Sequence, residues 1–514
     1  MVVFQTTLAL LLGAALLSLL ARRINVPYPT LLALGGVAVA FLPGAPRLEL
    51  PPELILAFFV APVLLDAAHD TSLRDLRQNW VPILSLVLFA VGLTTVAVAI
   101  TVRYFFPDMP WGAAIALGAL LAPPDAVAAL AVLAQVNPPH RLRTILEGEG
   151  LLNDASSLLI YNLAIDAVAT RSFTVTGALP AFALVTFGSV AAGWVLAKLV
   201  GLFTARVDDA PTAIIIQFVT TFGVWLVAEH FHLSGVVTIV VFGLTTSRRT
   251  ARAMTAHIRI PSFATWESAT FVLNVLAFTL IGLQIKPIIE AIPKDAHKEQ
   301  LLVALTLLLV VIAVRMAWVL MYGSTQWLAR RAKHGGEVSP LTLTLKSGLM
   351  VGWSGMRGIV TLAAALAIPE NFPYRNFILL AAFTVVLGTL LIQGLTLSPL
   401  LRWLQLPPDN TVEEEITLAR KTALKAAMSQ LEEDHSPAAE RLKIEYQEAL
   451  KQTREGNDPR NSPGNTLRQG VVPKSRQAIE DLRSSGRIGD DAYRTVEQEL
   501  DWLELSTSAD SSSD

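Results

Sequence analysis

The sequence predicts an all-α, polytopic membrane protein with a charged, partly helical C-terminal tail. Two observations carry this prediction. Of the 514 residues, 53% are hydrophobic and only 16% are charged, whereas soluble domains carry about 25% charged residues. The charges are also uneven, because residues 1–406 hold 46 acidic or basic side chains and the last 108 residues hold 36. We therefore expect a transmembrane domain over 1–406 and a cytoplasmic tail over 407–514.

The first 406 residues divide into thirteen apolar runs, separated by short polar or Pro/Gly-marked joints. A membrane-spanning helix needs about 20 mainly apolar residues. Most of the runs reach that length, and the second and ninth are shorter. The sequence thus predicts about thirteen transmembrane helices. The runs lie at 3–20, 28–43, 52–69, 80–102, 111–136, 144–168, 177–204, 211–229, 233–247, 264–284, 300–323, 341–368 and 375–401.

Basic residues in the joints predict how the chain is oriented. Cytoplasmic loops carry an excess of Lys and Arg, and fourteen of these residues fall on one side of the expected membrane against seven on the other. The N-terminus is therefore expected outside and, after thirteen crossings, the tail inside. The fourteen are Arg22, Arg23, Arg74, Arg77, Arg141, Arg143, Arg206, Arg248, Arg249, Arg252, Arg259, Arg330, Arg331 and Lys333; the seven are Arg47, Arg103, Arg171, Lys286, Lys294, Lys298 and Arg375.

Composition also excludes several function classes. The chain contains no cysteine, which excludes disulfides, Cys-ligated zinc, iron–sulfur clusters and thiol catalysis. Its net charge of −2 gives no indication of nucleic-acid binding. We expect no enzyme activity, and no cofactor beyond transported ions.

The tail, residues 407–514, has a helical sequence pattern of its own. A helical pattern over Val412 to Gln452 is followed by a Gly/Pro/Asn joint at Gly456 to Gly464 and a second helix near Asp490 to Leu505. The last residues, Ser506 to Asp514, have the composition of a disordered end. The tail is expected to be a solvated surface that could take a regulatory partner.

Ionisable residues inside the apolar runs mark the candidate site. A charged group in hydrocarbon costs at least about 2.5 kcal/mol, so such residues are rare unless they function. Four of them lie near segment ends, where their side chains can reach water: Glu147, Asp166, Lys198 and Lys346. The others are Asp66, Asp125, Glu149, Asp154, Glu267, Arg315 and Arg357.

Two of the runs are predicted to be broken helices. Pro123 and Pro124 precede Asp125, and prolines remove helical hydrogen bonds. Three glycines surround Arg357 in the segment 352–358, where unwinding is cheap. If runs one to six and eight to thirteen are inverted repeats about the seventh, the two breaks correspond. Paired broken helices are typical of a transporter site near mid-membrane.

The sixth run places three polar groups together. Glu149 and Asn153 are one helical turn apart, and Asp154 lies about 100° further round the helix. Oxygen ligands without imidazole or thiolate suit a hard cation. A buried carboxylate that binds either a cation or a proton can exchange one for the other. The pattern therefore favours ion exchange over bond-making chemistry.

The balance of ionisable residues inside the apolar runs also favours ion exchange. Two buried arginines need anionic partners, because an unpaired buried charge is strongly unfavourable. Five buried acids face these two permanent cations, which leaves carboxylates free to bind protons or ions. The acids available are Asp66, Asp125, Glu149, Asp154 and Glu267.

Five motifs in order resemble the sodium/proton exchangers of the monovalent cation:proton antiporter family. They are Glu149 to Asp154, Pro123 to Val127, Gly355 to Gly358, Asn274 to Gln284 and Arg315 to Trp318. The resemblance runs through essentially all of residues 1–401. Gly486 to Leu503 is similar to the tails of one bacterial branch.

The resemblance implies thirteen helices, a dimerisation domain and a mobile core that works by an elevator-like movement. It implies a homodimer in the plasma membrane, the bacterial inner membrane, for pH and sodium homeostasis. In this family pattern Asp154 carries the ion and the proton, with Na⁺ at Asp154 and Asp125 nearby. Asn153 and Asp125 would hold the two broken helices at their crossing.

The resemblance also assigns the remaining charged residues. Glu149 would pair with Arg315, and Arg357 would lie at the break in the twelfth run. Asp66 would lie near the cytoplasmic approach to the ion site. The family pattern gives no role to Glu267.

This chain departs from the family pattern at two positions. Gly150 and Pro124 stand where many members have Ser and Thr, so a serine hydroxyl ligand is absent and backbone carbonyls or water would replace it. The Asn153-Asp154 pair resembles the electroneutral branch, which implies one cation per proton. Na⁺ is the expected ion, Li⁺ is an expected substrate, and a K⁺/H⁺ antiporter is the nearest alternative.

Three other classes compete. An intramembrane aspartyl protease pairs two aspartates, but its Gly-x-Gly-Asp context is missing around Asp125 and Asp154. An ion channel predicts a polar stripe along several helices, whereas these charges cluster at one depth. An organic-anion transporter could use Arg315 and Arg357, and the excess of acids weighs against it.

Overall fold

A computed structural model of the chain shows two compact units, Met1–Pro408 and Asp409–Asp514. All regular structure in the described residues is helical. Each unit is treated by itself. The residues described are 2–24, 26–43, 56–133, 138–170, 175–204, 206–334, 341–407 and 409–507.

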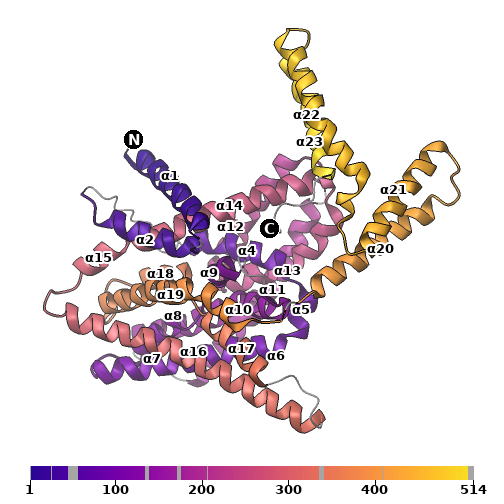
Figure 1. Cartoon of the computed structure of the whole chain (residues 1–514). Coiled ribbons are helices and arrows are strands. Elements are labelled where there is room, and N and C mark those ends of the chain that lie inside the picture. The colour runs from indigo at the N-terminus through magenta and orange to yellow at the C-terminus, as the bar shows by residue number, and fades with distance from the viewer. Residues whose placement is uncertain are drawn as a thin grey trace. The chain divides into compact units, whose positions relative to one another are not determined.

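The first unit is a bundle of long helices (Figure 1). Its elements are α1 (Val2–Arg23), α2 (Tyr28–Ala40), η1 (Leu56–Val60), α4 (Ala61–Asp70), α5 (Leu73–Gln78), α6 (Trp80–Leu84), η2 (Ser85–Ala90), α7 (Val91–Phe105), α8 (Trp111–Leu121), α9 (Ala126–Leu133), α10 (His140–Thr170), α11 (Val175–Thr204), α12 (Ala210–His230), α13 (Gly235–Ala253), α14 (Ala256–Leu283), α15 (Ile285–Glu290), α16 (His297–His334), α17 (Leu341–Trp353), α18 (Ile359–Leu366) and α19 (Arg375–Leu404).

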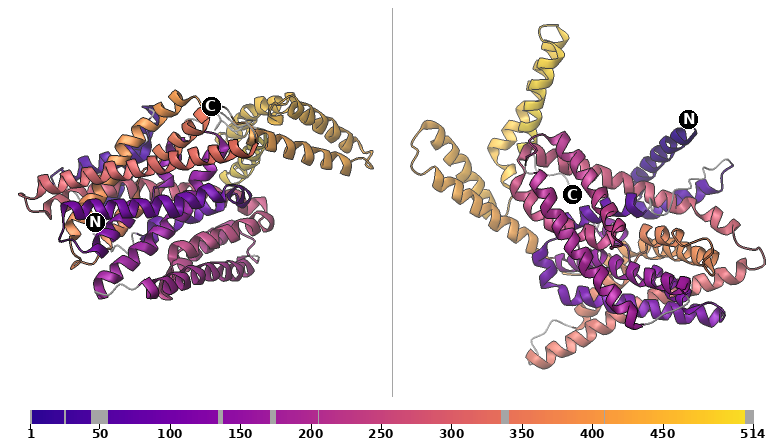
Figure 2. Two further views of the ribbon diagram at one scale, coloured as in Figure 1. Left: turned by 90° about the horizontal axis from the view of Figure 1, so that it is seen from below. Right: turned by 180° about the vertical axis from the view of Figure 1, so that it is seen from behind.

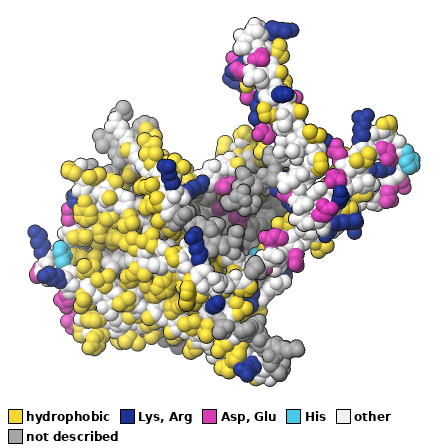
Figure 3. Space-filling model, viewed as in Figure 1, with side chains coloured by type: hydrophobic (Ala, Val, Ile, Leu, Met, Phe, Trp, Pro, Cys, Tyr) yellow, Lys and Arg dark blue, Asp and Glu magenta, His cyan; other side chains and the backbone are white. Residues whose placement is uncertain are grey.

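Seven helices among the described residues are long and apolar enough to cross a membrane. The two runs that the sequence marks as short correspond to two shorter apolar helices, Tyr28–Ala40 and Gly235–Ser247. Hydrophobic side chains cover most of the face of this unit in Figure 3, with Lys and Arg at its margins. On α16, Leu302 and Leu309 are 61% and 65% exposed. Such a broad exposed apolar surface fits lipid rather than water. The count of thirteen crossings stays a prediction.

Both helix interruptions that the sequence predicts are present. α8 ends at Leu121 and α9 begins at Ala126, across the Pro123-Pro124 pair. α17 ends at Trp353 and α18 begins at Ile359, across the glycine-rich segment. The proline pair removes two backbone donors, which explains why the helical ladder stops there. Each break leaves two half-helix ends inside the unit.

Close packing of α2 on α14 explains one family motif, Asn274 to Gln284. A Cβ atom at Gly282 would lie 2.1 Å from the carbonyl oxygen of Ala33, and one at Gly36 would lie 2.2 Å from that of Thr279. Only glycine permits the two backbones to approach this closely.

The π-helical segments η1 and η2 have no counterpart in the sequence prediction. They widen the helices locally, as π-bulges do. η2 carries Ser85, which receives a hydrogen bond from the indole of Trp318 on α16 (3.1 Å). The bulge thus lies beside a motif that the sequence analysis singled out.

The described residues of the tail, 409–507, form four helices and a short 3₁₀ turn, which corrects part of the sequence prediction. The expected single pattern from Val412 is two helices, because the chain turns before Pro437. A further helix, with Pro473 inside it, lies between the Gly/Pro/Asn joint and Asp490, where the sequence analysis predicted no helix. Of Ser506 to Asp514, expected to be disordered, Ser506 and Thr507 instead belong to the last turn of α23, and residues 508–514 lie outside the described residues. The elements are α20 (Thr411–Gln430), α21 (Pro437–Arg454), η3 (Pro459–Asn461), α22 (Pro463–Ser484) and α23 (Asp490–Thr507).

Asp458 ties α20 to the turn at η3 and should make the tail sensitive to acid. Hydrogen bonds from the Arg460 side chain (2.8 Å to Oδ2), with Arg420 at 3.2 Å, lower the pKa of Asp458 to about 2. A lowered pKa stabilises the fold above the ordinary carboxyl pKa of 3.8, and this contribution is lost as the pH falls towards 2. We expect circular-dichroism melts of residues 409–514 to lose stability between pH 4 and 2, with a weaker loss in Asp458→Asn.

A matched change at Glu455, an exposed carboxylate near the same turn, serves as the control. Glu455→Gln should keep the full loss of stability between pH 4 and 2. An identical acid profile for wild type and Asp458→Asn would contradict the assignment to Asp458.

Candidate functional site

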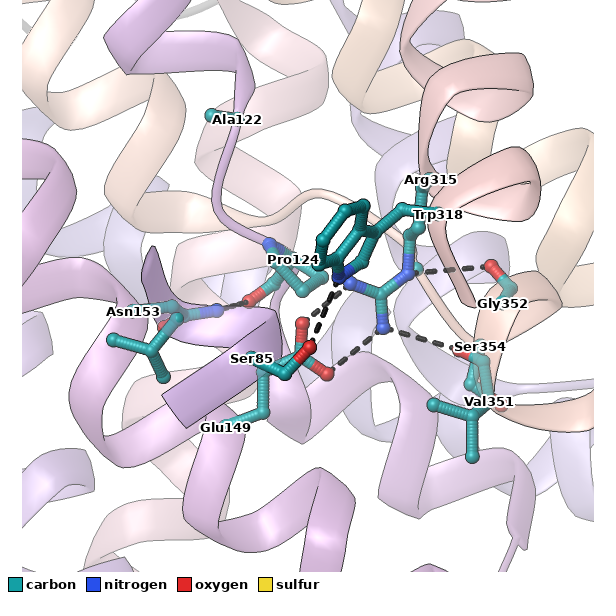
Figure 4. A network of polar contacts seen from close by, with 12 residues as sticks. Ser85, Ala122, Pro124, Glu149, Asn153, Arg315, Trp318, Val351, Gly352 and Ser354 are labelled. Atoms are coloured by element: carbon teal, nitrogen blue, oxygen red, sulfur yellow. Dashed lines mark hydrogen bonds and ion pairs between the residues drawn. The ribbon is translucent and has the colours of Figure 1, made fainter. Parts of the chain in front are cut away.

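The two broken helices cross and are joined through their backbones. The amide of Asp125 donates a hydrogen bond of 2.6 Å to the carbonyl oxygen of Met356. The side-chain amide of Asn153, on α10, donates to the carbonyl oxygen of Pro124 at 2.8 Å, as Figure 4 shows. A backbone carbonyl within the first break thus has a buried hydrogen-bond partner. α10 and both breaks form one connected site.

Asp125 places its carboxylate at the N-terminal ends of two half-helices. Its Oδ1 accepts a hydrogen bond of 2.8 Å from the amide of Val127 in α9, and its carboxyl group also faces the amides of Ala128 and Ile359. Helix N-termini carry partial positive charge. The carboxylate of Asp125 therefore compensates the positive ends of α9 and α18.

Arg357 compensates the opposite, negative end. Its Nε and Nη2 atoms donate to the carbonyl oxygens of Leu121 (3.1 Å) and Ala122 (3.2 Å), where α8 ends. Its Nη1 atom donates to the carbonyl oxygen of Gly355. Its backbone amide donates to Oγ1 of Thr389 at 3.0 Å. The guanidinium is fully buried.

This arrangement corrects the sequence expectation that both arginines need acidic partners. Among the residues described by the structure, Arg357 forms no salt bridge with a carboxylate, and its donors bind carbonyl groups instead. The C-terminal carbonyls of a half-helix carry partial negative charge and here take the place of an acid. An additional acidic side chain is therefore left without a permanent cation.

Arg315 and Glu149 form a buried ion pair, drawn in Figure 4. Arg315 donates through both terminal nitrogens, with 2.8 Å from Nη2 to Oε2 of Glu149. The same guanidinium donates to the carbonyl oxygens of Val351 (3.0 Å) and Gly352 (3.2 Å), near the end of α17. The two side chains are only 2% and 1% exposed. The pair fastens α10 and α16 to the second break.

Asp154 is the carboxylate at the crossing that no described residue neutralises. It is buried on α10, with 8% of its surface exposed, and it interacts electrostatically with Asp125. Within the described part of the chain it forms no salt bridge and no hydrogen bond. Oδ2 of Asp125 and Oδ1 of Asn153 are also buried without a hydrogen-bond partner. Three oxygen-bearing side chains are thus available to a cation.

Asp66 and Glu267 lie away from the crossing of the two broken helices. Asp66 lines a cavity among α4, α11, α12, α13 and α14, where its carboxyl group faces Thr270 and Glu267 on α14. No interaction joins it to the described residues of the crossing. The sequence-predicted site residues therefore form one network at the crossing and a separate acidic group on α4.

The sequence analysis missed three further residues that build the site. Ser157 donates to the carbonyl oxygen of Ala119 (2.5 Å) on α8, and Tyr161 donates to that of Ala364 (2.8 Å) on α18. Both continue the one-in-four spacing of Glu149 and Asn153 along α10, so this spacing was a usable signal.

Thr389 is the third missed residue and gave no such signal. It is one of four hydroxyl residues in the mainly apolar helix α19, where Thr usually bonds its own backbone. Its role depends on Arg357, which lies 32 positions earlier in the chain.

The departure at Gly150 has a steric explanation. A Cβ atom at this position would lie 2.2 Å from the Cβ of Ala126, the first residue of α9. Real Cβ atoms do not approach this closely, so glycine lets α10 pack directly against the second half of the broken helix. The site therefore lacks a serine hydroxyl at position 150, and the backbones of α10 and α9 lie closer together there.

Gly358 is expected to be essential for the position of Asp125. A Cβ atom there would lie 1.4 Å from Oδ2 of Asp125. The backbone φ of −137° is open to any residue. Glycine is therefore needed because a side chain would collide with Asp125, and not because the backbone is strained. We expect Gly358→Ala to reduce cation-driven proton flux in proteoliposomes at least tenfold.

Gly348→Ala, in α17, is the matched control, because the nearest atom to its added Cβ would lie 3.4 Å away. It should keep flux within about twofold of wild type. Wild-type flux in Gly358→Ala would show that the Asp125 carboxylate need not stay between the two helix ends.

Comparison with known proteins identifies the family. A family model described as "Sodium/hydrogen exchanger, transmembrane" matches residues 8–403. The chain belongs to the sodium/hydrogen exchanger family. It is therefore a multi-pass membrane antiporter of cations and protons, and not an enzyme.

Individual relatives and solved structures agree with this membership. The "Sodium, potassium, lithium and rubidium/H(+) antiporter" of Bacillus subtilis is 30% identical over 98% of this exchanger and 78% of its own length. The "Low-affinity Na(+)/H(+) antiporter NhaS1" of Synechocystis is 29% identical over 83% and 80%. The solved structure of the sodium proton antiporter MjNhaP1 from Methanocaldococcus jannaschii matches 78% of this chain and 98% of its own, with a TM-score of 0.59 and 17% identity. The last comparison shows the shared fold.

Proposed function

We propose that this exchanger moves one monovalent cation, Na⁺ first and Li⁺ next, against one proton through Asp154. This proposal rests on the buried carboxylate of Asp154, which no described cation compensates and which lies beside the unpartnered oxygens of Asp125 and Asn153. A buried negative charge needs a counter-charge. Either a proton or a cation supplies it, and the two therefore compete for the same group.

The carboxylate and amide oxygens at the crossing favour a hard monovalent cation as the transported ion. Carboxylate and amide oxygens are preferred by hard cations, and no imidazole or thiolate takes part in the network at the crossing. The Bacillus subtilis relative is named for sodium, potassium, lithium and rubidium, which supports K⁺ as the alternative substrate. An organic anion is a weaker candidate, because Arg315 and Arg357 already bind Glu149 and backbone carbonyls.

The geometry supports an electroneutral cycle. Asp125 balances the positive ends of α9 and α18, while Arg357 and Arg315 balance the negative ends of α8 and α17. These fixed charges stay paired, and only Asp154 changes its partner. Exchange of one Na⁺ for one H⁺ at that group moves no net charge, so membrane potential should not drive it.

The wider architecture is proposed on the same basis. Thirteen crossings follow from the apolar runs, and their arrangement as inverted repeats follows from the two matching breaks. The Arg-rich joints favour the N-terminus outside and the tail in the cytoplasm, and the family favours the bacterial plasma membrane. Core and dimerisation parts would move as an elevator, with Asp66 near the cytoplasmic approach. A homodimer fits α1, which projects from the first unit in Figures 1 and 2 and exposes Leu8, Leu12 and Leu16.

The test is cation-induced dequenching of a pH-sensitive dye in proteoliposomes that carry an outward proton gradient. Na⁺, Li⁺ and K⁺ are compared from pH 6 to 9 at constant ionic strength. We expect Na⁺ and Li⁺ to dequench the dye and the rate to be unchanged by a valinomycin-set potential. A response to K⁺ alone would make the protein a K⁺/H⁺ antiporter. Silence to all three ions would overturn the proposal and move organic-anion exchange to first place.

A further inference from the structure

A cavity in the first unit, away from the crossing, carries chemistry that cation exchange at the crossing does not use. It measures about 100 Å³ and lies among α4, α11, α12, α13 and α14. Its walls combine two carboxylates, Asp66 and Asp70, with the aromatic side chains of Phe242, Phe263 and Trp266. We propose that this cavity binds a small alkylammonium group.

The carboxylates supply the negative charge. Neither Asp66 nor Asp70 forms a salt bridge with any residue that the structure describes. Among the described residues that line the cavity, Arg259 is the one permanent cation, and His69 donates from Nδ1 to the carbonyl oxygen of Leu65 at 2.9 Å. The described lining therefore has a negative excess.

Two charged residues outside the cavity lining also act on these acids. Glu267, on α14, interacts electrostatically with both carboxylates, and Arg143, on α10, interacts with Asp70. Their charges oppose one another. The negative excess of Asp66 and Asp70 over Arg259 therefore remains.

The aromatic walls select the shape of the cation. Trp266 is held by a hydrogen bond from Nε1 to Oε1 of Gln217 (2.6 Å) and by stacking on Phe218 with ring centroids 4.5 Å apart. A fixed indole beside carboxylates is the arrangement that binds alkylated ammonium ions through cation–π contact. No set of three His, Asp or Glu side chains converges as metal ligands in the described residues. The walls therefore suit an organic cation better than a bare metal ion.

A buried hydroxyl marks the cavity independently. Ser262, on α14, is 5% exposed, lines the cavity, and its Oγ atom has no hydrogen-bond partner. Buried polar atoms are nearly always paired, so this hydroxyl is available to a ligand. The volume is below the roughly 150 Å³ of an engineered cavity that binds benzene, which limits the ligand to a few carbons around its nitrogen.

Two sources could supply this group. One is a soluble amine. The ammonium of a phospholipid head group has the same chemistry, and Arg259 would meet its phosphate. Neither source requires ion exchange at Asp154, so binding is measured without transport.

The experiment uses the full chain in detergent and titrates tetramethylammonium chloride by calorimetry at constant ionic strength, with tert-butanol as the neutral isostere. We expect tetramethylammonium to bind, tert-butanol not to bind, and Asp70→Asn to weaken binding at least tenfold. Asp208→Asn, an exposed aspartate on the loop before α12, should leave binding unchanged. Asp154→Asn should also leave it unchanged, which separates this cavity from the transport site.

Repeating the titration in nanodiscs distinguishes the sources. If phosphatidylcholine added to phosphatidylglycerol weakens tetramethylammonium binding tenfold, a lipid head group occupies the cavity; if it does not, a soluble amine does. Both outcomes retain the proposal. Absence of binding, equal displacement by Na⁺, loss in Asp208→Asn equal to that in Asp70→Asn, or loss in Asp154→Asn would overturn it.

Discussion

Asp154→Asn is expected to abolish exchange while leaving the fold intact. The wild-type side chain makes no hydrogen bond or salt bridge with a described residue, so asparagine loses no contact of that kind. It removes a buried negative charge beside Asp125, which relieves repulsion between the two groups. Dye dequenching should fall to the level of empty liposomes, and the unfolding temperature in detergent should stay the same or rise.

Asp125→Asn should behave differently and so serves as the first comparison. That carboxylate accepts the amide of Val127 and compensates two helix ends, and losing it should cost about 0.5–2 kcal/mol of stability. Loss of exchange with loss of stability is the expected result there. Glu147→Gln, on the same helix as Asp154 but partly exposed, should alter neither property.

Exchange at wild-type rate in Asp154→Asn would place the carrying carboxylate elsewhere. Asp125 would then be next, because its Oδ2 is the other unpartnered acidic oxygen at the crossing. Asp154→Glu sharpens the result, since a retained carboxylate should give residual exchange where asparagine gives none.

Features with a local cause could be predicted from the sequence. The two helix breaks follow from Pro123-Pro124 and from the glycines around Arg357, because these residues act on their own turn of helix. The polar face of α10 follows from the helical repeat of Glu149 and Asn153. The apolar runs and the charged tail follow from composition.

Features that depend on contacts between distant parts of the chain could not be predicted from the sequence. Spacing alone left five acids as partners for two arginines, and the pairing of Arg315 with Glu149 joins residues 166 positions apart. The binding of Arg357 to the carbonyls of α8 depends on how the two breaks cross. α22 has no counterpart in the sequence analysis, which assigned no element between Gly464 and Asp490.

Breaking the Glu149–Arg315 pair is the second large effect that we expect. Glu149→Gln leaves the guanidinium of Arg315 buried at 2% exposure without a full negative charge. Removing one partner of a buried pair costs about 3–5 kcal/mol, enough to unfold many proteins of ordinary stability. We expect a large fall in unfolding temperature in detergent and a low yield of folded protein. Arg143–Glu147, partly exposed one turn earlier on α10, is the matched pair, and Glu147→Gln should cost less than about 1 kcal/mol.

The double variant Glu149→Gln/Arg315→Gln separates charge from geometry. If the cost of Glu149→Gln comes from an uncompensated cation, removing that cation should recover part of the stability, and the double-mutant cycle should show strong coupling. Recovery should stay incomplete, because Arg315 also binds the carbonyls of Val351 and Gly352 at the end of α17. Additive losses would mean that these carbonyls, and not Glu149, are the principal partners of Arg315.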